Sequence, residues 1–467
     1  MLMADVKLLP PSENAPFDIN KKLEELPVEL RLRAKDRLRV TRLRHTKGLL
    51  TKIMLLVALI GPGLLVMIAD NDAGGVITYA QTGSIFGIGF FIPLMVLMVP
   101  TAYFVQEMTV RLAAVTRRGH AEMIWRRYGS FWGAFSLIDL LIANSLTMVT
   151  EFIGISFGMS LFGVSRPIAV LVGVLFVLAV TLMLRYHRWE RVSLIIALFN
   201  LVFLPLVLFA HPNWSVVASA FATWHVDGGI TQLFLYVLLA NLGTTIAPWM
   251  LFFQQSSEVD KGTVPEDIGA GRRDTFIGAC VMSAVAVSII IFTGTLVFNG
   301  AQVTSATNTA HYSIAAILST VSHKVGLLPT KLFALGLIDA GLIAAIALTA
   351  STSWAVGEAF KWPKSINLPF RQGRKFYLPG IASVLIAAAI VLVPNMPLGF
   401  LNITVQVVAS IFMPAALLFL LLLANDRDIM GKYVNKRWEN AGTIIIMAVL
   451  ISMSALYGIT ILFPGAI

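Results

Sequence analysis

The chain has 467 residues, of which 57% are apolar and 13% are charged, while a soluble globular protein has about 25% charged residues. This composition excludes a soluble enzyme, a disordered protein and a nucleic-acid-binding module, and it is typical of a polytopic helical membrane protein. The net charge of +10 fits basic cytoplasmic loops, and the one cysteine excludes an intrachain disulfide or a cysteine-based metal cluster.

Residues 1–49 are the one long polar stretch, and basic residues crowd its second half from Arg31 to Lys47. The stretch is too long and too polar for a secretory signal. We therefore expect a cytoplasmic tail, either flexible or folded as an amphipathic helix on anionic lipid. A membrane-embedded core is expected at 50–424, and a cytoplasmic loop with one more span at 425–467.

Apolar stretches of about 20 residues, each long enough to cross a bilayer, follow from residue 50 onward. The eleven expected spans lie at 50–82, 87–115, 132–160, 167–185, 190–211, 229–257, 274–300, 329–357, 376–393, 398–424 and 441–464. Basic residues gather in alternate loops, on the same side as the basic N-terminus. This pattern predicts a cytoplasmic N-terminus and an extracellular C-terminus, in the inner or plasma membrane of a prokaryote.

The first span carries two acids, Asp70 and Asp72, directly before the glycine pair Gly74 and Gly75. A carboxylate at mid-membrane depth is costly and normally functional. The glycines weaken the helix at the same point, so we expect an interruption there.

The sixth span contains Pro248, which removes a backbone hydrogen bond and disfavours helix at the residue before it. Two spans that lie five apart are thus interrupted at similar depth. This pattern predicts inverted repeats of five helices, at about 50–211 and 229–424, with a binding site at the membrane midplane.

Several motifs beside these breaks carry a resemblance: Gly-Pro-Gly at 61–63, Gln-Thr-Gly at 81–83, a segment at 111–116 and Gln-Val-Val at 406–408. On these motifs the chain resembles the NRAMP family of divalent-metal transporters over roughly 50–424. The resemblance implies an all-α LeuT-type fold, with two inverted five-helix repeats, an eleventh helix, and helices 1 and 6 broken.

The chain departs from two signatures of that family. Asp-Ala-Gly-Gly at 72–75 stands where the family has Asp-Pro-Gly-Asn, and Ala-Pro-Trp at 247–249 where it has Met-Pro-His. The methionine sulfur is therefore expected to be missing, and smaller residues leave room for water. Oxygen ligands and retained waters suit Mg²⁺. The pattern is similar to the NRAMP-related magnesium transporters, a divergent branch that also accepts Mn²⁺.

Eight residues have an expected role, which rests on the resemblance for some and on their chemistry and position for others. Asp72 is the expected direct ligand, Gly75 and Thr244 are expected to offer backbone carbonyls, Gln406 to contact the ion or a bound water, and Ala247 to widen the site. Asp70, Glu151 and Trp249 are expected to support the site or to line the access path. For most of these, helix-break geometry or plain packing is the alternative role.

Proton coupling in the family relies on the histidine after the proline and on an aspartate in span three. Trp249 and Met148 stand there, and neither titrates. We therefore expect facilitated Mg²⁺ uptake by alternating access. The first alternative is a proton-coupled Mn²⁺/Fe²⁺ symporter. A remote one is an amino-acid carrier of the same fold, whose carboxylate substrate Asp70 and Asp72 would repel.

Enzyme activity is not expected, because the sequence shows neither a nucleophile–base pair nor a zinc-protease motif. No cofactor is expected besides Mg²⁺ or Mn²⁺ as the transported substrate. The expected partner is the lipid bilayer, with no nucleic acid and no obligate protein partner. Asp339, inside span eight, has no assigned role.

Overall fold

The computed structural model describes residues 61–300 and 313–462, and all of them belong to one compact unit. The predicted cytoplasmic tail and the first part of span one lie outside the described residues. Within the described part of the chain, every regular element is helical, as the apolar runs predict.

The first span consists of two short helices, α4 (Pro62–Ala69) and α5 (Ala73–Phe86). The next four spans are α6 (Phe91–Thr116), α7 (His120–Ser160), α8 (Arg166–Met183), and the series α9 (Tyr186–Leu198), η1 (Phe199–Val202) and α10 (Phe203–Ala210). These five spans correspond to the first of the two predicted repeats.

The sixth span again has two parts, α12 (Gln232–Thr245) and α13 (Pro248–Lys261). It is followed by η2 (Pro265–Asp267) with α14 (Ile268–Leu296), then α16 (Leu327–Ala359), α17 (Arg374–Val391) and α18 (Leu398–Ala424). The last span, α20 (Arg437–Leu462), follows α19 (Arg427–Met430) and η4 (Gly431–Tyr433).

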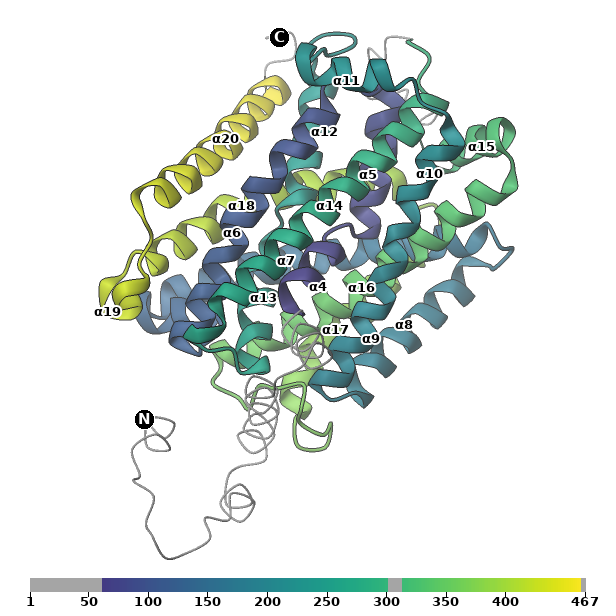
Figure 1. Cartoon of the computed structure of the whole chain (residues 1–467). Helices are drawn as coiled ribbons and strands as arrows, with labels where there is room; N and C mark the ends of the chain where they lie inside the picture. The colour runs from purple at the N-terminus through teal and green to yellow at the C-terminus, as the bar shows by residue number, and fades with distance from the viewer. Residues whose placement is uncertain (1–60, 301–312, 463–467) are drawn as a thin grey trace, which may run out of the picture. The chain divides into compact units, whose positions relative to one another are not determined.

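Ten described segments are long and apolar enough to cross a membrane, and α4 together with α5 accounts for the additional predicted span. Figure 1 shows α4 and α5 among the other helices and α20 at the periphery. The most apolar part of α20 is only 11% buried, whereas 94% of the corresponding part of span six is buried. The two broken spans thus belong to the core, and α20 is an outer addition.

Three features differ from the expected spans. Helix α7 consists of two helical segments that meet at a kink at Gly129, whose φ is 86°. The apolar segment after the kink matches the expected span at 132–160, and the polar segment before it, from His120, was not expected. Two further helices, α11 (Trp214–Thr223) and α15 (Ile314–Val325), lie between spans. They have 10 and 12 residues, too few to appear in a search for spans.

The N-terminal end of α4 is held by a carboxylate from another span. Oδ2 of the buried Asp274, on α14, accepts hydrogen bonds from the backbone N–H groups of Gly63 at 2.8 Å, Leu64 at 3.1 Å and Gly61 at 3.3 Å. The first N–H groups of a helix lack partners within the helix, and they carry a partial positive charge. Asp274 therefore caps α4 and fixes where the first half of span one begins.

Replacing Asp274 with Ala removes this cap, and we expect the protein to lose about 1–3 kcal/mol of stability. The measurement is the melting temperature of the purified protein in detergent. Asp274→Asn retains an oxygen acceptor and should lose clearly less; equal losses in the two variants would contradict the capping role.

Candidate metal-transport site

Span one is interrupted at three residues, Asp70, Asn71 and Asp72. The Asp72 backbone is extended, with φ −66° and ψ 170°, and its Oδ1 accepts a hydrogen bond from the N–H of Gly75 at 2.5 Å. Asp72 is therefore the N-cap of α5, and the interruption expected from the acids and glycines is present. One of its carboxylate oxygens is engaged in holding the helix.

A second carboxylate supports the same helix start. Glu151, fully buried on α7, accepts a hydrogen bond from the N–H of Ala73 at 2.9 Å, and its other oxygen accepts one from Thr150 Oγ1 at 3.2 Å. The side chains of Glu151 and Asp72 also interact directly. Both acids lie at the positive end of the α5 dipole, which favours negative charge there.

Span six is interrupted at Ile246 and Ala247, immediately before Pro248. Ala247 has an extended backbone, with φ −100° and ψ 146°, and Pro248 occupies the first turn of α13, where its missing N–H has no consequence. The break expected from the proline is therefore present as well.

Position 247 carries no methionine sulfur, as expected, but a thioether from another residue lies close to this break. The Sδ atom of the buried Met250 lies 3.5 Å from the backbone nitrogen of Ala247 and accepts its hydrogen bond. Position 247 itself carries no sulfur, but a thioether reaches the break from three residues later. The first turn of α13 brings it there, because residues three apart share a helix face.

The two breaks meet at Gly75. A Cβ on this glycine would lie 2.6 Å from Thr244 Oγ1, 3.1 Å from Asp72 Oδ1 and 3.5 Å from the backbone oxygen of Asp70. Three oxygens from both broken spans therefore surround one glycine. The space beside Gly75 is filled by the Thr244 hydroxyl and is not free for water. Any side chain at position 75 would therefore displace Thr244.

Gln406 reaches span one on a neighbouring face. A Cβ on Gly74 would collide with its amide nitrogen and would lie 2.8 Å from Thr150 Oγ1. This amide nitrogen is buried without a partner among the described residues. Gln406 thus lies beside the interruption of span one. It meets the helix at Gly74, whereas Thr244 meets it at the next residue, Gly75.

Asp70 differs from Asp72 in its surroundings. It follows the last residue of α4, it is 1% exposed, and both of its carboxylate oxygens lack a hydrogen-bond partner within the described ranges. The Thr244 hydroxyl is likewise buried without a partner there. The break therefore contains oxygen atoms that no neighbouring described group satisfies.

Trp249, in the first turn of α13, is buried in the protein interior. Its ring lies 5.9 Å from that of Phe253, edge to face, and its backbone oxygen accepts a hydrogen bond from Ser351 at 3.3 Å. Ala247 is buried beside it.

Sequence reasoning missed four residues that hold or extend the breaks. Asn200 donates to the backbone oxygen of Asn71 at 3.2 Å, and Asn402 donates to that of Gly74 at 3.1 Å. The Tyr79 hydroxyl lies 3.2 Å from Thr245 Oγ1, and Met250 contacts Ala247. The two asparagines could have been found from the sequence, because an amide side chain inside an apolar span needs a polar partner.

Within residues 61–300 and 313–462, no group of three or more His, Cys, Asp or Glu side chains is arranged to hold a metal ion. An ion at the breaks would therefore rely on Asp70, Asp72 and uncharged oxygens. Few charged ligands suit an ion that keeps part of its water shell.

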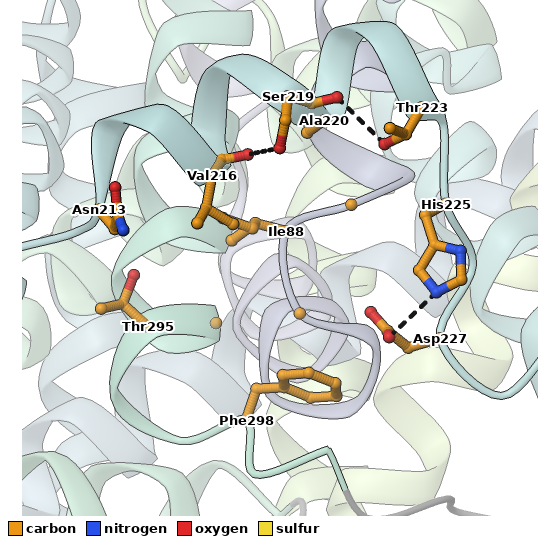
Figure 2. Close-up of a pocket in the computed structure, with 13 residues that line it drawn as sticks. Ile88, Asn213, Val216, Ser219, Ala220, Thr223, His225, Asp227, Thr295 and Phe298 are labelled. Carbon is orange, nitrogen blue, oxygen red and sulfur yellow. Dashed lines mark hydrogen bonds and ion pairs between the residues drawn. The ribbon is translucent and has the colours of Figure 1, made fainter.

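A pocket of about 610 Å³ lies at the far end of α5 from the break. Gly87 and Gly89, which follow α5, line it together with residues of α11 and the end of α14. Figure 2 shows His225 and Asp227 at its rim, with His225 Nε2 3.3 Å from Asp227 Oδ1. Because α5 has 14 residues, the pocket is separated from Asp72 by about 21 Å of helix.

The chain resembles named bacterial transporters in sequence and solved transporter structures in fold. It is 28% identical over 397 residues to the Divalent metal cation transporter MntH 1 of Pseudomonas aeruginosa, covering 82% of this chain and 87% of that protein. It is 25% identical over 413 residues to MntH of Lacticaseibacillus casei, covering 85% and 88%.

Crystal structures of the manganese transporter of Eremococcus coleocola share the fold. A complex with an aromatic bis-isothiourea compound has a TM-score of 0.71 at 20% identity and covers 88% of each chain. A mutant has a TM-score of 0.71 at 21% identity and covers 90% of this chain and 91% of its own.

The predicted all-α LeuT-type fold with two broken helices is confirmed. The family model described as "Natural resistance-associated macrophage protein-like" matches residues 63–460, and the chain therefore belongs to the Nramp family.

Proposed function

We propose that the chain is a secondary transporter that carries divalent metal cations across a bacterial cell membrane by alternating access. The observation that carries this proposal is the meeting of the two broken spans at Gly75, where Asp72 Oδ1, Thr244 Oγ1 and the Asp70 backbone oxygen converge. The names of the relatives, divalent metal cation transporters and a manganese transporter, support the same class of substrate.

We further propose that Mg²⁺ is the main substrate, bound partly hydrated, and that Mn²⁺ is also accepted. The oxygens at the break are carboxylate, hydroxyl and carbonyl groups, which suit these hard ions. Thr244 takes part through its hydroxyl, and Gln406 approaches from the neighbouring face at Gly74. The thioether of Met250 already accepts the hydrogen bond of Ala247, which reduces its value as a ligand for soft ions.

A proton-coupled Mn²⁺/Fe²⁺ symporter is the second candidate, and the contact between Glu151 and Asp72 favours it. Two carboxyl groups that interact directly share a proton readily. We nevertheless favour uniport, because Trp249 and Met148 stand at the positions of the family's titratable residues. The driving force is then the membrane potential, worth about 4.6 kcal/mol for two charges across 100 mV.

The proposed orientation places the N-terminus in the cytoplasm and the C-terminus outside, as the alternate basic loops suggest. The pocket at the end of α5 then opens on the extracellular side, and the Asp274 cap of α4 lies on the cytoplasmic side.

Asp72→Asn should abolish uptake of Mg²⁺ and Mn²⁺ into liposomes. The amide oxygen can still cap α5, so folding is preserved while the charge is lost. Radiometal or fluorescent uptake measures transport, and the melting temperature confirms the fold. Full transport by this variant would contradict the role of Asp72.

Ala247→Met should raise transport of Cd²⁺ and Mn²⁺ relative to Mg²⁺ severalfold, because it adds a soft ligand at the break. The assay is competition between these ions for uptake. Met250→Leu is the matched control and should leave the ratio nearly unchanged. Gly75→Asn, by contrast, should impair transport of every ion, because its Cβ would displace Thr244.

Uptake in proteoliposomes should respond to voltage and not to protons. An inside-negative potential should accelerate Mg²⁺ entry, and a pH-sensitive dye inside the vesicles should record no acidification linked to transport. Acidification that requires both the ion and the active protein would support the symporter and contradict uniport.

A further inference from the structure

Asp70 is unusual among the buried carboxylates of the described residues, because both of its oxygens lack a hydrogen-bond partner. The other acids near the breaks are engaged: Asp72 and Glu151 accept backbone hydrogen bonds at the start of α5. A buried carboxylate without a partner is unfavourable unless something of opposite charge binds it.

The position of Asp70 along its helix increases this cost. It follows the C-terminal residue of α4, where the backbone carbonyls carry a partial negative charge. Asp72, only two residues on, lies at the positive start of α5. The helix ends therefore stabilise Asp72 and leave Asp70 as the carboxylate with the stronger need for a cation.

The surroundings of Asp70 offer oxygen atoms and no described positive charge. Asp72, two residues further along the chain, acts on it electrostatically. The hydroxyl of Tyr79 lies 3.2 Å from Thr245 Oγ1, and both acids act on it electrostatically. The hydroxyl of Thr244 is buried nearby without a partner.

We propose that Asp70 is a direct ligand of the transported ion, so that two carboxylates, Asp70 and Asp72, together balance a divalent cation. This inference rests on the proposed function and extends it. Two negative charges neutralise Mg²⁺ or Mn²⁺ but leave a net charge beside a monovalent ion. The hydroxyls of Thr244 and Tyr79 add uncharged oxygens, which suit a partly hydrated hard cation. Asp70 thereby sets the preference for divalent over monovalent ions.

Asp339 provides a matched control. It is a buried acid in α16, 7% exposed, and its Oδ2 also lacks a partner among the described residues. It lies two residues before Gly341, which contacts the break through Ala73. Residues two apart point to nearly opposite sides of a helix, so Asp339 faces away from the break.

The test compares Asp70→Asn, Asp72→Asn and Asp339→Asn with the wild type. Melting temperatures of the purified proteins are measured at pH 8 in EDTA and in rising Mg²⁺ or Mn²⁺. Asp70→Asn should be at least as stable as the wild type without ions, because it removes an unpaired buried charge. Its apparent affinity for both ions should fall roughly tenfold or more. A loss of this size is already typical when a residue that only hydrogen-bonds to a metal ligand is replaced. Asp339→Asn should keep wild-type affinity.

Uptake into liposomes, with K⁺ as competitor, completes the experiment. Asp70→Asn should lose Mg²⁺ transport and should be more sensitive to K⁺ than Asp339→Asn. Wild-type affinity in Asp70→Asn, or a loss of ion-free stability in that variant, would overturn the ligand role while leaving the proposed function intact. A wild-type protein that neither binds nor transports either ion would instead contradict the proposed function.

Discussion

A helix that stops inside a membrane exposes backbone N–H and C=O groups where no water is available to satisfy them. This constraint governs the centre of the molecule. Asp274 caps the start of α4, and Asp72 and Glu151 hold the start of α5. Asn200 donates to the carbonyl group of Asn71 inside the break, and Asn402 donates to that of Gly74 in the first turn of α5. The interruption of span one is therefore held by side chains from three other helices, α7, η1 and α18, and it is a stable element of the fold.

The same capping divides the two acids of span one between different tasks. One carboxylate oxygen of Asp72 caps the helix that begins there, whereas the carboxylate of Asp70, at the end of the preceding helix, has no described hydrogen-bond partner. The glycine at position 75 then allows span six to come close enough for Thr244 to face both. Fold and ion binding are thus linked, because the charges that an ion would meet are set by the polarity of two helix ends.

The spans and their two breaks were predictable because each has a local cause: apolar length, a proline, or acids beside glycines. The contacts inside the site were not. Whether Thr244 offers its hydroxyl or its carbonyl depends on how α12 is rotated, and the arrival of the Met250 sulfur depends on the first turn of α13. Neither rotation follows from spacing within one segment. The polar start of α7 was missed because a search for apolar runs ignores amphipathic turns.

A crystal structure of the protein grown with Mn²⁺ tests the central claim most directly, because the anomalous signal of manganese marks the ion independently of the protein. The account predicts a single strong peak between α4 and α5, within coordination distance of Asp70 and Asp72 and beside Thr244. A peak elsewhere in the membrane region, or a first span that runs as one unbroken helix through residues 70–72, would contradict it.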